Sequence, residues 1–132
     1  INELRLEDKV VWQEKMEQKF LSRIYQMADF FLLPTEYEIF GMVLLEAMYY
    51  KNIILTTNNG GSSTLIENEV NGFVLENKDV DSWAKCIKEI YSNKRKLQEI
   101  QENAFLSVAN KFTWDVLAER FIEQYKNKLN GE

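Results

Sequence analysis

The sequence is poor in the residues that most often carry chemistry or cross-links. It contains no histidine, one cysteine, one proline and five glycines among 132 residues. Without histidine, no imidazole base, His–Cys pair or histidine metal ligand can be completed within the chain. The single Cys86 excludes an internal disulfide and a thiolate metal cage, and fits a reducing cytosol. So little proline and glycine also excludes collagen-like and low-complexity chains.

Long apolar runs and an excess of basic residues are missing too. No stretch approaches the roughly 18 apolar residues of a transmembrane segment, and the start lacks the apolar core of a signal peptide. The 16 basic against 21 acidic residues give a net charge of −5. Nucleic-acid-binding proteins usually carry a basic face, so we expect no nucleic-acid partner. We expect a cytoplasmic protein, with peripheral contact to the cytosolic face of a membrane as an alternative.

The chain nevertheless has enough apolar surface for one packed domain. Hydrophobic residues make up 45% of it and aromatic residues 13%, which is too much for a disordered chain. The length of 132 residues suits one domain, since domains usually run about 100–200 residues. The first residue is Ile1 rather than Met. We expect residues 1–132 to form one domain that is incomplete at its N-terminal side.

The first two thirds alternate strand-like runs with helical periodicity. Apolar runs predict four strands, at 10–12, 29–33, 53–57 and 73–75. Stretches between them predict three helices, at about 14–27, 40–50 and 62–67. The run that Pro34 closes is typical of a central strand in a parallel sheet, and Asn and Gly at 58–61 predict a turn. This order favours an α/β, Rossmann-like parallel sheet with flanking helices.

The last third predicts helices only. Asp79 and Thr113 are candidate N-caps, and a further helix spans about 94–109. In the last helix, apolar residues recur every three or four positions, at Trp114, Leu117, Phe121, Tyr125 and Leu129. Gly131 is its predicted end.

Two loops are candidates for a binding site. In an open parallel sheet, ligands bind beyond the carboxyl ends of the strands, where residues 34–41 and 58–62 are expected. The first loop holds Glu38 and leads into a helix that opens with Phe40-Gly41-Met42-Val43. Free N–H groups at a helix start attract phosphate, and a glycine lets a ligand approach the backbone closely.

Two glutamates at these positions suit a particular kind of ligand. Glu38 and Glu46 are eight residues apart, which is about 12 Å along a helix at 1.5 Å per residue. That separation is comparable to the distance between the two sugars of a nucleotide diphosphate sugar. Because a carboxylate can accept two hydrogen bonds from a vicinal diol, each glutamate could hold one sugar, with the diphosphate between them.

Simpler interpretations of the same residues stay open. Acidic residues are common near helix starts because they favour the helix dipole, so Glu38 alone fits a solvated charge. Gly60-Gly61 alone fits a turn, and Cys86 fits a small core residue. Trp83 and Trp114 fit packing better than a sugar-binding platform.

Several motifs, taken in order, resemble one known family. They are Ala28 to Thr35, Glu38 to Met48, Gly60-Gly61 and Val70 to Val74. They resemble the donor-binding domain of the GT-B glycosyltransferases, specifically the retaining family 4, the glycosyl transferases group 1 domain. Glu38 and Glu46 fall where that family carries its E-x7-E motif. The resemblance covers nearly the whole chain and implies the C-terminal part of a GT-B donor-binding domain.

The resemblance also implies a role for each matching position. Glu46 would bind the ribose of the nucleotide, and Glu38 would face the transferred sugar as the catalytic carboxylate. The donor sugar and diphosphate would lie against Phe40, Gly41, Met42, Val43, Gly60 and Gly61. The family transfers a sugar from a nucleotide diphosphate sugar with retention, without an obligatory metal or other cofactor.

The chain departs from the family pattern at several points. Lys51 and Ile53 stand where Gly and Pro are frequent, and Thr64 where Glu is common. The family's Arg–Lys pair that neutralises the diphosphate would precede Ile1, as would the domain that binds a carbohydrate or lipid-linked acceptor. Since a diphosphate beside two carboxylates is repelled, we expect residues 1–132 alone to be inactive and to bind donor poorly.

The sequence therefore predicts the donor-binding part of a retaining glycosyltransferase that serves glycan or polysaccharide assembly. One alternative is a nucleotide-sugar epimerase of GT-B-like fold, although such enzymes usually need a histidine. Another is a non-catalytic α/β interaction module in which the glycines serve only as turns.

Overall fold

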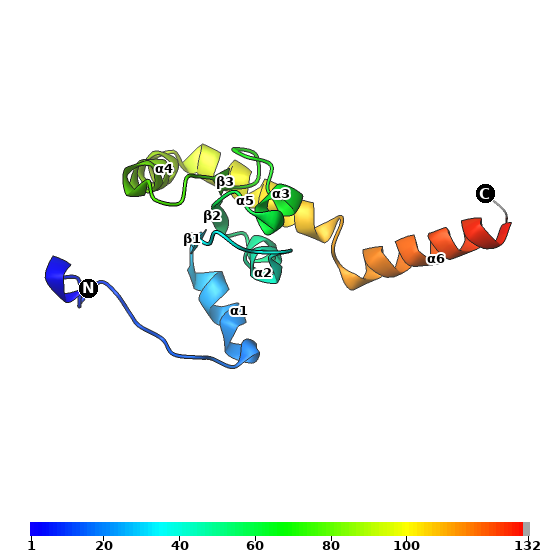
Figure 1. The fold of residues 1–132 in the computed structure, drawn as a ribbon, viewed down its shortest axis with the longest axis horizontal. Coiled ribbons are helices and arrows are strands. Elements are labelled where there is room, and N and C mark those ends of the chain that lie inside the picture. The colour runs from blue at the N-terminus through cyan, green and yellow to red at the C-terminus, as the bar shows by residue number, and fades with distance from the viewer. Residues whose placement is uncertain (131–132) are drawn as a thin grey trace.

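The structure is a computed structural model that describes residues 1–130. It contains a three-stranded parallel sheet in the order β1-β2-β3, with helices on both faces (Figure 1). In chain order the elements are η1 (Asn2–Leu4), α1 (Gln18–Met27), β1 (Phe30–Leu33), α2 (Met42–Tyr49), β2 (Ile53–Thr56), α3 (Gly60–Leu65), β3 (Phe73–Val74), α4 (Val80–Ser92), α5 (Lys94–Ala109) and α6 (Trp114–Asn130). The predicted end of the last helix, Gly131, lies outside the described residues.

The middle strand of the sheet is β2. Phe30 of β1 lies opposite Ile53, and Leu55 lies opposite Phe73 of β3. All four residues of β2 are buried, whereas Leu32 of β1 is 45% exposed. The prediction that the run before Pro34 forms a central strand is therefore wrong for the described residues, where β1 is an edge strand. An apolar run shows that a strand is suited to burial, but does not show which strands pair with it.

Side chains from the two faces of the sheet form two separate cores. Ile54 points to one face and packs with residues of α1, α2, α3 and α5, including Leu44 and Ala104. Ile53 and Leu55 point to the other face and pack with α4 and α5, including Trp83. This alternation follows from the two-residue period of a strand. Helix α5 contributes to both cores, with Ala104 and Val108 in the first and Ile100 in the second. The helix layers hold β2 in place, and with it the loops at its ends.

Several element boundaries differ from the prediction. Residues 10–12 form no strand, and Val11 and Trp12 are 90% and 81% exposed because no partner strand lies beside them among the described residues. The first helix begins at Gln18 rather than near residue 14, and its buried residue is Tyr25, while Phe20, Ile24 and Met27 are exposed.

The last helix, α6, buries little of its apolar surface. Figure 1 shows it extending away from the sheet and the other helices. Trp114 is 87% exposed and Tyr125 is 70% exposed, so the regular apolar spacing does not mark a face packed within residues 1–130. No helix in this range is long and apolar enough to cross a bilayer.

Candidate functional site

The loops that follow β1 and β2 are tied together at the carboxyl edge of the sheet. The carbonyl oxygen of Thr35 accepts hydrogen bonds from the Thr57 hydroxyl and, at 3.2 Å, from the Asn59 side chain. The Thr56 hydroxyl donates to the carbonyl of Leu33 at 3.0 Å. These bonds place the two candidate loops side by side, as expected for parallel strands.

Glu38 closes the turn that leads into α2. Its Oε1 accepts a hydrogen bond from the Gly41 N–H at 3.1 Å, so the carboxylate is half-buried and bonded to the chain rather than fully solvated. Gly41 has φ 82°, in the left-handed region that favours glycine, and a Cβ there would lie 2.9 Å from Leu44 Cδ1. The helix then begins at Met42, two residues later than predicted.

The Gly60-Gly61 pair packs directly against this turn. The Gly61 N–H donates to the Glu38 carbonyl at 3.1 Å. A Cβ on Gly60 would lie 2.7 Å from the carbonyl oxygens of both Glu38 and Ile39. Neither glycine of the pair has a positive φ, and both belong to α3. The prediction of a turn at 58–61 is therefore wrong for the two glycines, whose lack of a side chain permits close approach of two backbones.

The first turn of α2 leaves backbone donors free. The N–H groups of Met42 and Val43 have no acceptor within residues 1–130, as is usual for the first residues of a helix. The side chains of Met42 and Val43 are 61% and 37% exposed. The Gly41 N–H, in contrast, is used by Glu38. An anion that approached this helix start would meet two unpaired donors.

Glu46 lies one turn further along α2 and faces α1. Its Oε2 accepts a hydrogen bond from the Tyr25 hydroxyl at 3.2 Å, and its Oε1 accepts one from Gln18 Nε2 at 3.4 Å. A cavity of about 120 Å³ lies beside the carboxylate. It is lined by Gln18, Leu21, Ser22, Tyr25, Glu46 and Tyr50. The Glu46 carboxylate is thus hydrogen-bonded to α1 and also borders a small cavity.

The structure brings the predicted site residues together in two adjoining groups. Glu38 contacts Gly41 and also contacts both glycines of the pair, whereas Glu46 lies on α2, one turn beyond the start of that helix. The helical rise used to predict the separation of the glutamates applies only from Met42 onwards, because Glu38 belongs to the preceding turn.

The sequence prediction missed the two α1 residues that contact Glu46. Gln18 and Tyr25 are seven positions apart and, with Leu21, lie on one helix face. The sequence shows that these three residues share a face, but the apolar residues at 20, 24 and 27, which are exposed in the structure, predicted that another face of α1 would be buried. Burial, followed by the charge of Glu46 and its hydrogen bond, raises the pKa of the Tyr25 hydroxyl to about 12.

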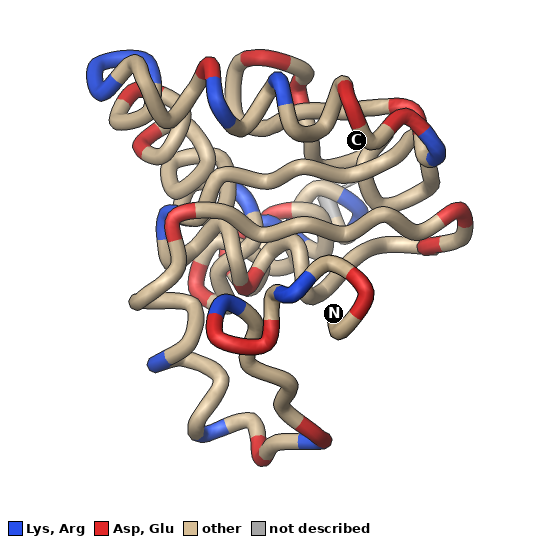
Figure 2. Tube along the Cα trace, turned by 90° about the vertical axis from the view of Figure 1, so that its left-hand side faces the viewer, with Lys and Arg blue, Asp and Glu red and all other residues tan. Residues whose placement is uncertain are grey.

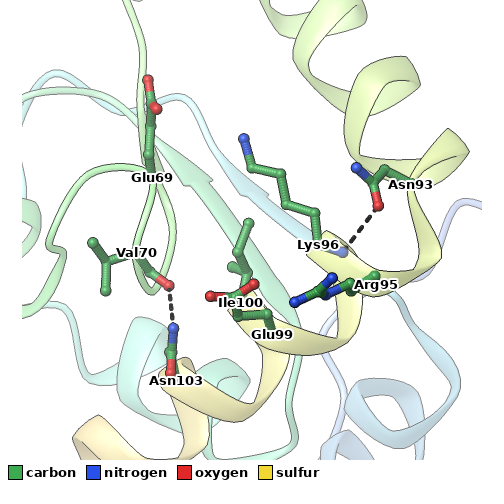
Figure 3. Close-up of a pocket in the computed structure, with 8 residues that line it drawn as sticks. All are labelled: Glu69, Val70, Asn93, Arg95, Lys96, Glu99, Ile100 and Asn103. Carbon is green, nitrogen blue, oxygen red and sulfur yellow. Dashed lines mark hydrogen bonds between the residues drawn. The ribbon is translucent and has the colours of Figure 1, made fainter.

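Another cavity lies away from this site. Its volume is about 360 Å³, and it separates the start of α5 from the loop before β3 (Figure 3). Asn103 donates to the carbonyl of Val70 at 3.1 Å, and Asn93 caps α5 by accepting from the Lys96 N–H. Because Val70 precedes β3, this cavity is at the amino edge of the sheet. None of the predicted site residues lines it.

The two glutamates of the candidate site, Glu38 and Glu46, have no cationic partner among residues 1–130, since neither forms an ion pair with a lysine or arginine there. Acidic and basic positions are interspersed along the chain (Figure 2). No group of three cysteine or acidic side chains in the described part of the chain could hold a metal ion. Cys86 packs beside one core, where burial raises the pKa of its thiol.

Comparison with proteins of known sequence identifies relatives along most of the chain. The family described as "Glycosyl transferases group 1" matches residues 1–107. An uncharacterized glycosyltransferase of Methanocaldococcus jannaschii is 32% identical over 124 residues, which cover 94% of this chain and 32% of the relative. The glycogen synthase of Thermodesulfovibrio yellowstonii is 34% identical over 113 residues, which cover 83% of this chain and 22% of that enzyme. The chain thus spans about a third or less of the length of these relatives.

Solved structures confirm the predicted fold class, an α/β fold with a parallel sheet, flanking helices and a final helix. Sucrose-phosphate synthase from Thermosynechococcus elongatus matches with a TM-score of 0.83 and 23% identity, over 99% of this chain and 33% of that one. Anabaena HepE in complex with UDP-glucose matches with a TM-score of 0.82 and 23% identity, over 96% of this chain and 34% of that one. With the family match over residues 1–107, the chain belongs to the glycosyl transferases group 1 family.

Proposed function

We propose that residues 1–132 are the C-terminal, donor-binding part of a retaining glycosyltransferase of family 4. The whole enzyme would transfer a sugar from a nucleotide diphosphate sugar to a glycan or lipid-linked acceptor in the cytoplasm. The acceptor would be bound by the part of the enzyme outside this chain, which spans about a third or less of its curated relatives. The domain needs no metal or other cofactor in this proposal.

One observation carries the proposal. Glu38 and the glycine pair are in contact at the carboxyl edge of the sheet, next to the free amides that begin α2, with Glu46 on the same helix. The carboxylates can accept hydrogen bonds from the sugars at the two ends of a nucleotide diphosphate sugar, and the free amides can donate to the diphosphate between them. The complex of Anabaena HepE with UDP-glucose supports this reading, because that protein shares the fold.

The role proposed for each residue comes from the family resemblance, and its placement in the structure supports that role. Glu46 would accept hydrogen bonds from the two ribose hydroxyls of the nucleotide. The diphosphate and sugar would lie against the backbone of Phe40 to Val43, where the N–H groups of Met42 and Val43 have no acceptor among residues 1–130. Gly60 and Gly61 would let α3 approach the turn that carries Glu38, since a side chain at Gly60 would collide with that turn.

Glu38 would act on the transferred sugar. Its carboxylate would accept hydroxyl hydrogen bonds from the sugar and stabilise the positive charge that develops as the bond to the diphosphate breaks. The Gly41 N–H donates a hydrogen bond to this carboxylate at 3.1 Å and orients it. Glu38 is therefore the residue expected to affect the chemical step, and Glu46 the residue expected to affect nucleotide binding.

Substitution of each glutamate in the intact enzyme tests this division. Glu46→Ala should raise the KM for the donor about 10- to 100-fold with little change in kcat, because it removes hydrogen bonds to a charged group. Glu38→Ala should lower kcat about 100- to 1,000-fold, as for removal of one transition-state contact. Glu67→Ala, an exposed glutamate in a loop, is the matched control and should change neither.

Titration of the intact enzyme with UDP-, GDP- and ADP-sugars separates this proposal from its alternatives. Saturable binding followed by transfer to an acceptor supports it. Conversion of the donor to an epimer without transfer would instead indicate an epimerase. Failure to bind any of the three nucleotide classes would favour a non-catalytic interaction module. Normal kinetics in both glutamate variants would instead show that the assignment of Glu38 and Glu46 to the site is wrong.

A further inference from the structure

The carboxylate of Glu46 is held by two uncharged donors from α1. The Tyr25 hydroxyl contacts Oε2 at 3.2 Å, and Gln18 Nε2 contacts Oε1 at 3.4 Å. We propose that Tyr25, assisted by Gln18, is a positioning residue that orients Glu46 so that both carboxylate oxygens can accept hydrogen bonds from one ribose diol. This inference rests on the proposed role of Glu46 in nucleotide binding.

Counting lone pairs shows why this arrangement suits a diol. A carboxylate offers about four acceptor positions, two on each oxygen. Tyr25 occupies one position on Oε2 and Gln18 one on Oε1, so one position remains on each oxygen. Two adjacent hydroxyls need one acceptor position each. The two bonds to α1 therefore leave a matched pair and limit rotation of the carboxylate.

Tyr25 is itself rigidly placed. Its side chain is 8% exposed, and its ring stacks on that of Tyr50 with centroids 5.8 Å apart and planes 9° from parallel. Its backbone carbonyl accepts a hydrogen bond from the buried Asn52 side chain at 2.8 Å. Asn52 lies directly before β2, so the sheet fixes the end of α1 that carries the hydroxyl.

The uncharged state of Tyr25 matters for this role. Its pKa of about 12 keeps the hydroxyl protonated, and therefore a donor, throughout the pH range of an enzyme assay. A lysine in the same place would form an ion pair and neutralise the carboxylate. Tyr25 and Gln18 orient Glu46 without removing its charge, which strengthens hydrogen bonds from the ribose hydroxyls.

Removal of the hydroxyl alone tests the inference. Tyr25→Phe in the intact enzyme keeps the stacked ring. Isothermal titration should use whichever of UDP, GDP and ADP the wild type binds, and the 2′,3′-dideoxy analogue of that nucleotide. We expect binding of the ribonucleotide to weaken about five- to tenfold, the usual effect of one hydrogen bond. We expect the dideoxy analogue to bind variant and wild type equally, and kcat at saturating donor to stay unchanged.

Matched variants separate positioning from a structural role. Tyr49→Phe removes the hydroxyl of a 48% exposed tyrosine in the same aromatic cluster and should change neither affinity. Gln18→Ala, at the exposed start of α1, should reproduce the selective loss more weakly even where Tyr25→Phe folds poorly. Equal weakening of both nucleotides by Tyr25→Phe and Gln18→Ala would overturn the inference.

Ribonucleotide binding by Glu46→Ala distinguishes failure of this inference from failure of the proposed donor site on which it rests. If Glu46→Ala weakens ribonucleotide binding and the two α1 variants do not, Glu46 binds ribose without help from α1 and only the positioning role is wrong. If the wild type binds none of the three nucleotides, the donor site and the positioning role are both wrong.

Discussion

At the scale of single residues, glycine is required at the site for two different physical reasons. Gly41 has a positive φ, so its backbone conformation favours glycine. Gly60 and Gly61 have ordinary backbone angles but lie against the turn that carries Glu38. The first glycine shapes the entry to α2, and the other two allow α3 to approach it. A substitution at Gly60 therefore acts on the position of Glu38.

We expect Gly60→Ala to impair transfer in the intact enzyme. The new Cβ would lie 2.7 Å from the carbonyl oxygens of Glu38 and Ile39, so the turn has to move. Because small displacements of a catalytic group cost up to about 100-fold in rate, kcat/KM should fall at least about tenfold. Overpacking should also lower the free energy of unfolding by about 1–3 kcal/mol.

Steady-state kinetics and urea denaturation measure these two effects. Ser63→Ala provides a control on the exposed side of the same helix, and should leave kcat/KM within about twofold, as is usual for surface substitutions. A Gly60→Ala enzyme with wild-type kinetics would show that the approach of α3 does not position Glu38.

Not every site residue was equally predictable. Glu38 and Glu46 stood out because two carboxylates flank a glycine-containing helix start. Tyr25 did not, because its role depends on a contact between residues 21 positions apart. Local spacing shows which residues share a helix face, but the orientation of α1 against α2 comes from packing on the sheet.

At the scale of elements, the join between α1 and β2 depends on one buried side chain. Asn52 is fully buried, and its Nδ2 donates to the carbonyls of Tyr25 at 2.8 Å and Ala28 at 2.6 Å. These two carbonyls lie at the end of α1, where helical partners become few and the Tyr25 carbonyl also accepts from the Ala28 N–H at 3.3 Å. The Ile53 N–H adds a bond to the Asp29 carbonyl at 2.9 Å. Asn52 therefore links the helix end to the central strand.

We expect Asn52→Ala to destabilise the domain. The change leaves the Tyr25 and Ala28 carbonyls without this donor, and each lost buried partner costs about 1–3 kcal/mol. The midpoint of urea unfolding of the intact enzyme should fall accordingly. Asn58→Ala, at an exposed asparagine near the other end of β2, should stay within about 0.5 kcal/mol of wild type. Equal stability of the two variants would contradict the role given to Asn52.

Most elements were predictable, and the errors have physical causes. Residues 53–56 of the run at 53–57 form a buried strand and Asp79 caps α4, as the local residue types indicated. The run at 10–12 has strand-forming residues but no strand beside it within residues 1–130. The regular spacing in α6 predicted a helix correctly, yet its packing depends on surfaces that a sequence period does not specify.

At the scale of the whole molecule, several apolar surfaces lack partners within residues 1–130. They include the free edge of β1, where Leu32 is 45% exposed, and the apolar residues of α6, such as Trp114 at 87%. The family relatives are roughly three times as long as this chain or longer. These facts support the proposal that the donor-binding part works together with further parts of an enzyme.

Donor binding by residues 1–132 alone provides the corresponding test. The proposed site presents Glu38 and Glu46 to a ligand whose diphosphate is also negative, and no lysine or arginine in the described range pairs with either glutamate. Since like charges oppose binding, we expect the isolated chain to bind UDP-, GDP- and ADP-sugars at least about tenfold more weakly than the intact enzyme. We also expect no transfer to any acceptor.

Circular dichroism should first establish that the isolated chain is folded, and the intact enzyme should be titrated in parallel. Equal affinity, or turnover by the isolated chain, would show that these residues form a complete donor site without additional cations.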